Sequence, residues 1–186
     1  MTEEAAPSDV PPSGLGVDRS AVPHEVQELS WAAFDAHIQS LARAVAASFV
    51  PEAVVGVAHG GVFVGGVLAS ALGADFFPVR ISRRARVPSR HPRLFGAMPK
   101  ELKGRRVLIV DDVSLSGETL QLAKRLAKAA GAKVVRTATL VSREKYAADF
   151  TVLKSGELYV FPWDYADVTE DERFESGPPR LARGRR

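Results

Sequence analysis

The spacing of apolar residues changes several times along the chain, from a helical period to short continuous runs and back. The first periodic segment predicts a helix over 31–49, with Ser30 as its N-cap, Pro51 beyond its end, and an apolar stripe of Trp31, Phe34, Ile38, Leu41 and Val45. Continuous apolar runs predict buried strands at 53–58, 75–81, 106–111 and 132–141. Two further helices are predicted, one after His59 that ends at Gly73 and one over 117–130 that ends at Gly131.

Strands that alternate with helices of this length indicate βαβ crossovers. The fold class is therefore predicted to be α/β, a mostly parallel twisted sheet flanked by helices. The basic segment 83–103 is predicted to be a long loop. Segment 143–165 breaks the alternation and is predicted to form a small appendage with two short strands. Ligands of such sheets bind at the carboxyl ends of the strands, so chemistry is expected there.

Segments without periodicity flank this region. Residues 1–27 are rich in Pro, Ser, Gly, Ala and acids, which predicts a disordered N-terminal tail. Residues 168–186 contain several arginines and are predicted to form a flexible basic tail. The interval 28–167 is then a single domain.

Composition and charge limit the kinds of site, location and partner that the chain can have. The chain has 186 residues and no cysteine, which excludes disulfides and thiolate metal sites. No apolar run reaches the roughly 18 residues of a membrane span, so no membrane association is predicted and a cytoplasmic location is the default. Segment 80–106 carries ten basic residues against the single acid Glu101. This segment indicates either an anionic partner, such as phosphate, pyrophosphate or nucleic acid, or a solvated loop kept soluble by arginine.

The run VLIVDDVSLSGETL, residues 107–120, places Asp111 and Asp112 directly after a buried strand. Burying carboxylates without partners is unfavourable, so a ligand is expected beside them. The turn 116–119 combines backbone amides, two hydroxyls and a helix N-terminus, which favours a phosphate, although it lacks the Gly-Lys-Ser/Thr of a P-loop. A sugar phosphate fits both features, with its phosphate in the turn and its hydroxyls or a hydrated Mg²⁺ at the acids.

This run resembles the phosphoribosyl-pyrophosphate motif of type I phosphoribosyltransferases: apolar residues, two acids, variable residues, then Ser/Thr-Gly-x-Ser/Thr. VVGVAHGG (54–61) resembles the family's pyrophosphate loop, which often contains a cis peptide. The basic stretch after Ile81 resembles the mobile loop that closes over the reacting centre. LYVFPWD (158–164), within a hood at about 143–165, resembles the base-binding hood of bacterial and archaeal guanine/xanthine/hypoxanthine members.

The resemblance implies a purine-salvage enzyme that moves ribose 5-phosphate from phosphoribosyl pyrophosphate to a 6-oxopurine base. It implies Mg²⁺ as cofactor and a homo-oligomer, and nucleic acid is not expected as a partner. Asp111 and Asp112 would orient the ribose and the hydrated metal, and His59 with Gly60 and Gly61 would hold pyrophosphate. The remaining expected contacts are the 5-phosphate turn (Leu115, Ser116, Gly117, Glu118 and Thr119), the loop arginines (Arg83 or Arg84) and the base contacts (Arg143, Tyr159 and Val160).

Besides Arg143, which stands where relatives place a Lys, two positions depart from the family pattern. Purine-specific members usually carry Asp where Leu115 stands, and leucine cannot transfer a proton. Glu118 could substitute if its side chain turned inward. The pyrophosphate loop usually carries Arg or Lys where His59 stands. The departures favour an alternative, a non-catalytic regulator that senses phosphoribosyl pyrophosphate or a nucleotide; an enzyme for another base is a further alternative. For Trp163, packing within the hood is expected.

Overall fold

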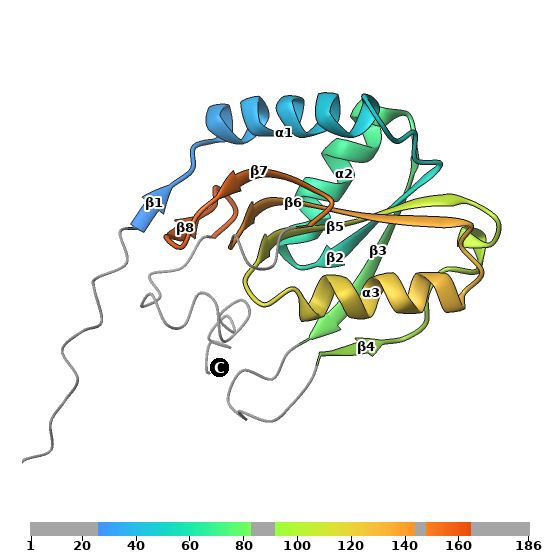
Figure 1. Cartoon of the computed structure of the whole chain (residues 1–186). Helices are drawn as coiled ribbons and strands as arrows, with labels where there is room; N and C mark the ends of the chain where they lie inside the picture. Colours follow the sequence, from blue (N-terminus) through green and yellow to red (C-terminus); the bar gives the residue numbers. More distant parts are fainter. Residues whose placement is uncertain (1–25, 83–91, 144–147, 165–186) are drawn as a thin grey trace, which may run out of the picture.

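The computed structural model describes residues 26–82, 92–143 and 148–164 (Figure 1). The helices are α1 (Trp31–Ala46), α2 (Gly60–Leu72), α3 (Glu118–Ala129) and the short 3-10 helix η1 (Lys100–Leu102). The strands are β1 (Val26–Glu28), β2 (Ala53–Ala58), β3 (Asp75–Ser82), β4 (Arg93–Phe95), β5 (Arg106–Ser114), β6 (Val134–Ser142), β7 (Phe150–Lys154) and β8 (Leu158–Val160).

The main sheet has six strands in the order β4-β3-β2-β5-β6-β7. Four of its neighbouring pairs are parallel, and β4 runs antiparallel to β3 at one edge. Strands β1 and β8 form a separate parallel pair, in which Gln27 faces Tyr159. The predicted α/β class with a mostly parallel sheet is confirmed.

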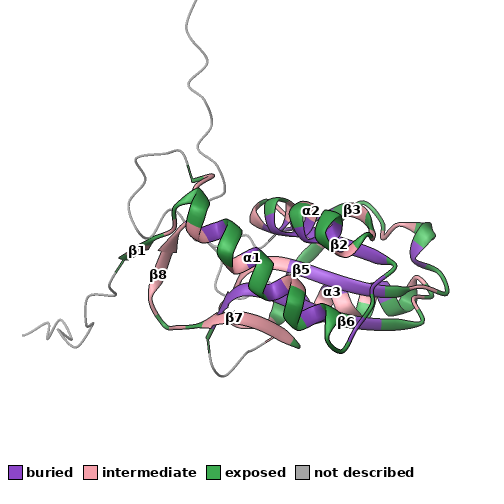
Figure 2. Cartoon of the chain, turned by 90° about the horizontal axis from the view of Figure 1, so that it is seen from above, coloured by how far each residue is buried: buried purple, intermediate pink, exposed green. Residues whose placement is uncertain are grey.

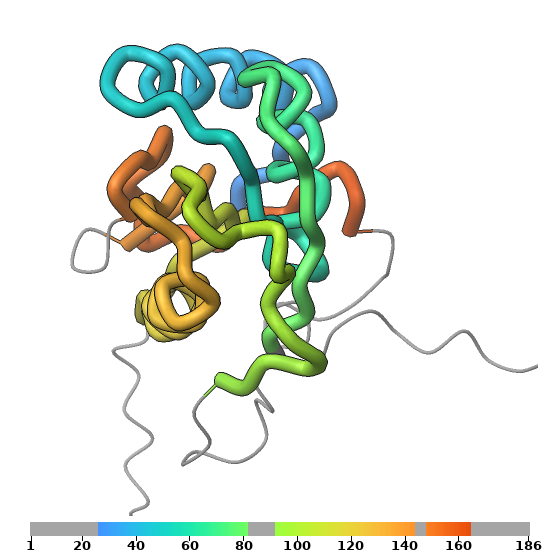
Figure 3. Tube along the Cα trace, turned by 90° about the vertical axis from the view of Figure 1, so that its right-hand side faces the viewer, coloured from blue at the N-terminus to red at the C-terminus, as the bar shows by residue number. Residues whose placement is uncertain are grey.

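Helices cover both faces of the main sheet. Helices α1 and α2 lie on one face and α3 lies on the other (Figures 1 and 3). The central strands β2, β5 and β6 are largely buried between these layers (Figure 2). This burial explains why the central strands read as continuous apolar runs rather than as alternating ones.

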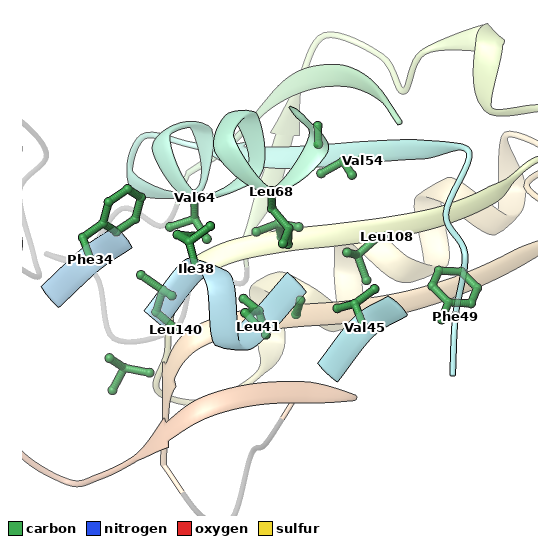
Figure 4. Packing of buried hydrophobic residues seen from close by; sticks show 14 of the residues in the cluster. Phe34, Ile38, Leu41, Val45, Phe49, Val54, Val64, Leu68, Leu108 and Leu140 are labelled. Carbon is green, nitrogen blue, oxygen red and sulfur yellow. The ribbon is translucent and has the colours of Figure 1, made fainter. Parts of the chain in front are cut away.

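Two apolar clusters fill the space between the layers. On the α1 and α2 face, Ile38 and Leu41 pack with Leu68, Leu108 and Leu140 (Figure 4). On the α3 face, a second cluster includes Val55, Ile109, Leu120, Ala123 and Ala127. Full burial of one such large side chain stabilises the fold by about 1.5–3 kcal/mol, so these clusters fix the position of β2 and β5.

Helix α1 begins and packs as its sequence pattern predicts, with two differences. Ser30 is the N-cap, and its Oγ accepts a hydrogen bond from the Ala33 N–H at 3.1 Å. The other stripe residues are buried, but Trp31 is 51% exposed because it lies at the helix start, beyond the edge of the cluster. The helix ends at Ala46, before the predicted end at residue 49.

Other predicted bounds shift by a few residues. Gly73, at φ 64°, ends α2 as predicted, whereas the C-cap of α3 is Ala130 and Gly131 follows at φ 92°. Strand β5 does not end at Asp111 but continues to Ser114, because its pairing with β6 extends to Ser142. The predicted loop 83–103 was partly wrong, since it contains β4 and η1; residues 83–91 lie outside the described residues.

The segment after β6 contains two strands, as predicted, but they do not form one appendage. Strand β7 joins the main sheet beside β6, and β8 pairs with β1. Asp149 explains the first contact, because its carboxylate accepts hydrogen bonds from the N–H and the hydroxyl of Thr137 at 2.8 and 2.9 Å. Val26 and Gln27, predicted to belong to the N-terminal tail, lie in β1; the rest of both predicted tails lies outside the described residues.

Candidate functional site

The two acids lie where the main sheet reverses its strand order. From the neighbouring central strands β2 and β5, the chain proceeds outward in opposite directions, to β3 on one side and to β6 on the other. The pairing of β2 with β5 ends at Val110, and Asp111 and Asp112 follow it directly. Open α/β sheets bind their ligands at such a switch point, at the carboxyl ends of the strands.

The start of α2 packs closely against these acids. A Cβ atom on Gly60 would overlap the Oδ2 of Asp112, and one on Gly61 would lie 2.6 Å from the carbonyl oxygen of Val110. Glycine is therefore required at both positions for the helix to approach the strand. The peptide bond between Ala58 and His59 is cis, as the resemblance implies. The predicted pyrophosphate loop and the acid pair thus form one wall of the same site.

The carboxylates are partly buried and hydrogen bonded within β5. The Oδ1 of Asp111 accepts the N–H of Asp112 at 3.1 Å, and the Oδ1 of Asp112 accepts the N–H of Val113 at 2.8 Å. Burial, followed by the negative charge of Asp112, holds the pKa of Asp111 well above its usual range. Burial also raises the pKa of Asp112. Two acids in this state are suited to bind a cation or hydroxyl groups that replace the missing solvent.

The turn between β5 and α3 provides an anion-binding geometry. Gly117 adopts φ 73° as the N-cap of α3, a left-handed conformation that favours glycine. The 12-residue helix α3 begins at the next residue, so its first N–H groups and its dipole are directed toward this turn. Leu115, Ser116 and Thr119 are partly buried beside it, whereas Glu118 is exposed. The exposure of Glu118 does not support its inward orientation as the missing proton carrier.

The structure describes most of the other predicted site residues, and they lie on different elements. His59 is exposed and makes no side-chain cap on α2. Arg143 is exposed after β6, and its N–H donates to the carbonyl of Ser114 at 3.2 Å, which places it beside the turn. Tyr159 and Val160 lie in β8, and Tyr159 packs against the cluster under α1 and α2. Arg83 and Arg84 lie outside the described residues.

Sequence reasoning missed two residues that act on Asp112. Thr139 is fully buried in β6, and its hydroxyl donates a hydrogen bond to the carbonyl oxygen of Asp112 at 2.8 Å. Burial is the main cause of the raised pKa of Asp112, and the negative charge of Asp164 makes a small further contribution in the same direction. Asp164 is the acid of the LYVFPWD run and could have been selected from it; nothing in the sequence pattern distinguishes Thr139.

The donor set at the acids fits Mg²⁺. Within the described ranges, no group of three or more His, Cys, Asp or Glu side chains could hold a metal ion by itself. Mg²⁺ usually takes one or two carboxylates and completes its shell with water and substrate phosphates, so Asp111 and Asp112 match its preference. None of the helices in the part of the chain that the structure describes combines the length and hydropathy needed to cross a membrane.

Fold and site together define an α/β protein in which an acid pair, a turn and a helix N-terminus follow one another at the end of a central strand. The chain belongs to the phosphoribosyl transferase domain family, whose model matches residues 28–169. Adenine phosphoribosyltransferase of Mycobacterium marinum is 35% identical over 100 residues, which cover 48% of this chain and 54% of that protein. Orotate phosphoribosyltransferase of Streptomyces avermitilis is 39% identical over 71 residues, which cover 38% of this chain and 39% of that protein. The chain thus spans about half or less of the length of these two relatives.

Solved structures agree with this family. The purine phosphoribosyltransferase of Pyrococcus horikoshii Ot3 superposes with a TM-score of 0.70 at 28% identity, covering 77% of this chain and 97% of that chain. The xanthine-guanine-hypoxanthine phosphoribosyltransferase of Helicobacter pylori has a TM-score of 0.63 at 21% identity, covering 76% of this chain and 95% of that chain, and shows the shared fold.

Proposed function

We infer that the chain is a phosphoribosyltransferase that transfers ribose 5-phosphate from phosphoribosyl pyrophosphate to a nitrogenous base. The bond between the ribose C1 and the pyrophosphate oxygen breaks, a bond from C1 to a ring nitrogen forms, and the base loses one proton to solvent. The observation that carries this inference is the close packing of Gly60 and Gly61 against Asp111 and Asp112. The strand that carries these acids leads through a short turn to the start of α3, where an anion would bind.

Each part of the site would bind one part of the donor. The turn Leu115–Thr119 would hold the 5-phosphate through its amides and the dipole of α3. Asp111 and Asp112 would accept hydrogen bonds from the ribose hydroxyls. The amides of Gly60 and Gly61 with His59 would hold the leaving pyrophosphate. These groups favour charge separation at the sugar centre, which needs mainly electrostatic stabilisation.

Mg²⁺ would be held by Asp111 and Asp112, partly through water. Bound there, it would neutralise charge on the departing pyrophosphate. Both carboxylates are partly buried side by side, and a cation held there would offset the repulsion between their charged forms.

A 6-oxopurine is the proposed base, and adenine is the second candidate. The LYVFPWD run and the likeness to the Pyrococcus purine enzyme support a purine. The adenine phosphoribosyltransferases among the relatives, 30–35% identical over about half of this chain, favour adenine. Leu115 also favours a base that needs no acidic side chain at that position.

Pyrophosphate release tests the proposal. The protein would be incubated with Mg²⁺, phosphoribosyl pyrophosphate and guanine, hypoxanthine, xanthine, adenine or orotate in turn. Release with one base and not with the others identifies the acceptor. Tight binding of phosphoribosyl pyrophosphate without release in any reaction would contradict the enzyme and support the sensing regulator, which Leu115 and the exposed His59 favour.

A homo-oligomer and a cytoplasmic location stay predictions that follow from the resemblance and from composition. Light scattering of the full chain after size-exclusion chromatography measures the first, and localisation of a tagged full-length protein measures the second.

A further inference from the structure

Five aromatic rings gather beside the site. The ring of Trp163 is stacked between Phe63 of α2, at 4.8 Å and 2°, and Phe161, at 4.9 Å and 4°. Trp31 and Phe34 of α1 contact the same ring at centroid distances of 6.2 and 5.2 Å. Stacking on both faces leaves the Trp163 ring little freedom, so the hood and α2 are joined through this side chain.

This contact links the hood to Asp112. Gly60, at the start of α2, lies against the Asp112 carboxylate so closely that no side chain fits between them. Trp163 reaches α2 through Phe63, about one helical turn after Gly60. On the hood side, Asp164 follows Trp163 directly and accepts the N–H of Phe161 at 2.9 Å, which holds the turn that carries Trp163. A shift of the hood would therefore move the start of α2 relative to Asp112.

We propose that Trp163 and Phe63 are positioning residues that couple the hood, on the base side, to the pyrophosphate side of the site by holding the start of α2 against Asp112. The proposal rests on the proposed function, because it assigns pyrophosphate to the start of α2.

The exposure of Phe63 separates this role from ordinary packing. Its side chain is 43% exposed, whereas core residues of the same helix such as Val64 and Leu68 are completely buried. Replacing Phe63 therefore removes the stacking partner that α2 offers to Trp163, with a small change in the buried core.

The test compares Phe63→Leu with Phe63→Tyr, which keeps the stacking ring and directs its hydroxyl toward solvent. Trp31→Leu is the matched control, because it removes an aromatic ring from the same cluster without breaking the contact between Trp163 and α2. Calorimetry measures the affinity for pyrophosphate and for phosphoribosyl pyrophosphate, each with Mg²⁺. Phe63→Leu should weaken both affinities about fivefold or more, a typical coupling between sites. Phe63→Tyr and Trp31→Leu should change them less than about twofold.

A double-mutant cycle with Trp163→Leu examines the link itself. If Phe63 acts through Trp163, Phe63→Leu should have a smaller effect in the Trp163→Leu background than in the natural chain. Full additivity, or an equal loss of affinity in Trp31→Leu, would show that the stack only contributes to packing and would overturn the proposal.

Failure of the two proposals can be told apart. If the natural chain binds neither pyrophosphate nor phosphoribosyl pyrophosphate, the proposed function fails, and this inference fails with it. If the natural chain binds both and Phe63→Leu binds them equally well, the coupling is wrong and the proposed function stands.

Discussion

At the scale of single residues, the charge of Asp111 lowers the stability of the folded chain at neutral pH. Burial and the charge of Asp112 raise the pKa of this acid, so the folded chain binds the proton of Asp111 more tightly than the unfolded chain. Stability therefore falls as pH rises from about 4, the ordinary pKa of the side chain, through the folded pKa.

Asp111→Asn should raise the melting temperature at pH 7 by a few degrees, since about 1 kcal/mol corresponds to roughly 2–4 °C in a chain of this size. The advantage should shrink as pH is lowered toward 4, where the natural Asp111 is also protonated. Thermal melts of both chains between pH 4 and 8 measure this, and identical melting temperatures at pH 7 would contradict it. Affinity for phosphoribosyl pyrophosphate should fall in the same variant, because asparagine carries no charge for the metal.

Gly60 makes a second prediction at this scale. In Gly60→Ala the new Cβ would overlap Asp112, so we expect the carboxylate to be displaced and binding of phosphoribosyl pyrophosphate with Mg²⁺ to weaken about tenfold or more, as other losses of metal-site support do. Gly66→Ala is the control in the same helix, because no atom lies within 4 Å of its added Cβ. Calorimetric titration measures the affinity of both variants for phosphoribosyl pyrophosphate with Mg²⁺. Equal affinities in Gly60→Ala and Gly66→Ala would show that Gly60 is not part of the binding site.

At the scale of elements, Asp149 fixes the start of β7 against β6. Burial alone would raise the pKa of Asp149, but the hydrogen bonds from the Thr137 hydroxyl and N–H, with the charge of Lys124 at 3.3 Å, outweigh burial and lower it. The charged carboxylate thus stabilises the fold above its ordinary pKa of about 3.9, and this contribution is lost as pH falls through the folded pKa.

Asp149→Asn should lower the free energy of unfolding at pH 7 by about 1.5–3 kcal/mol, the range for hydrogen bonds to a charged group. Asp35→Asn serves as control, because Asp35 is exposed and accepts a hydrogen bond from Gln39 on the surface of α1. Urea unfolding at pH 7 and at pH values down to about 2 measures both variants. A loss for Asp149→Asn that does not diminish between about pH 4 and pH 2 would mean that its charge is not what β7 requires.

Elements defined by local patterns were predictable from the sequence, and contacts between distant segments were not. The apolar run 53–58 predicted β2, and the Ser30 cap predicted the start of α1. Each of these features depends only on neighbouring residues. The place of β7 depends on Asp149 reaching a strand that precedes it in the chain. The site shows the same division: residues 111–119 are contiguous, whereas the action of Asp164 on Asp112 exists only once the hood is folded.

At the scale of the whole molecule, two sheets would divide the binding of the proposed substrates. The six-stranded sheet carries the acids and the start of α2, and the pair β1-β8 carries the hood residues Tyr159 and Val160. Strand β1 precedes the domain core in the chain, yet it pairs with β8 at the other end of the described sequence (Figure 1). The Leu29 N–H extends this pairing with a bond to the Val160 carbonyl at 2.9 Å.

The hood should therefore depend on β1, while the main sheet should not. A chain that begins at Leu29 lacks β1, and a chain that begins at Val26 keeps it and is the matched control. Backbone amides of β8 should exchange with solvent about tenfold faster in the shorter chain, because a two-stranded pair has no other strand to protect it. Amides of β5 should exchange at equal rates in both, since β5 lies between β2 and β6. Hydrogen exchange followed by mass spectrometry compares the two chains. Equal exchange of β8 would show that packing of the hood against α1, through Trp163, is enough to hold it without β1.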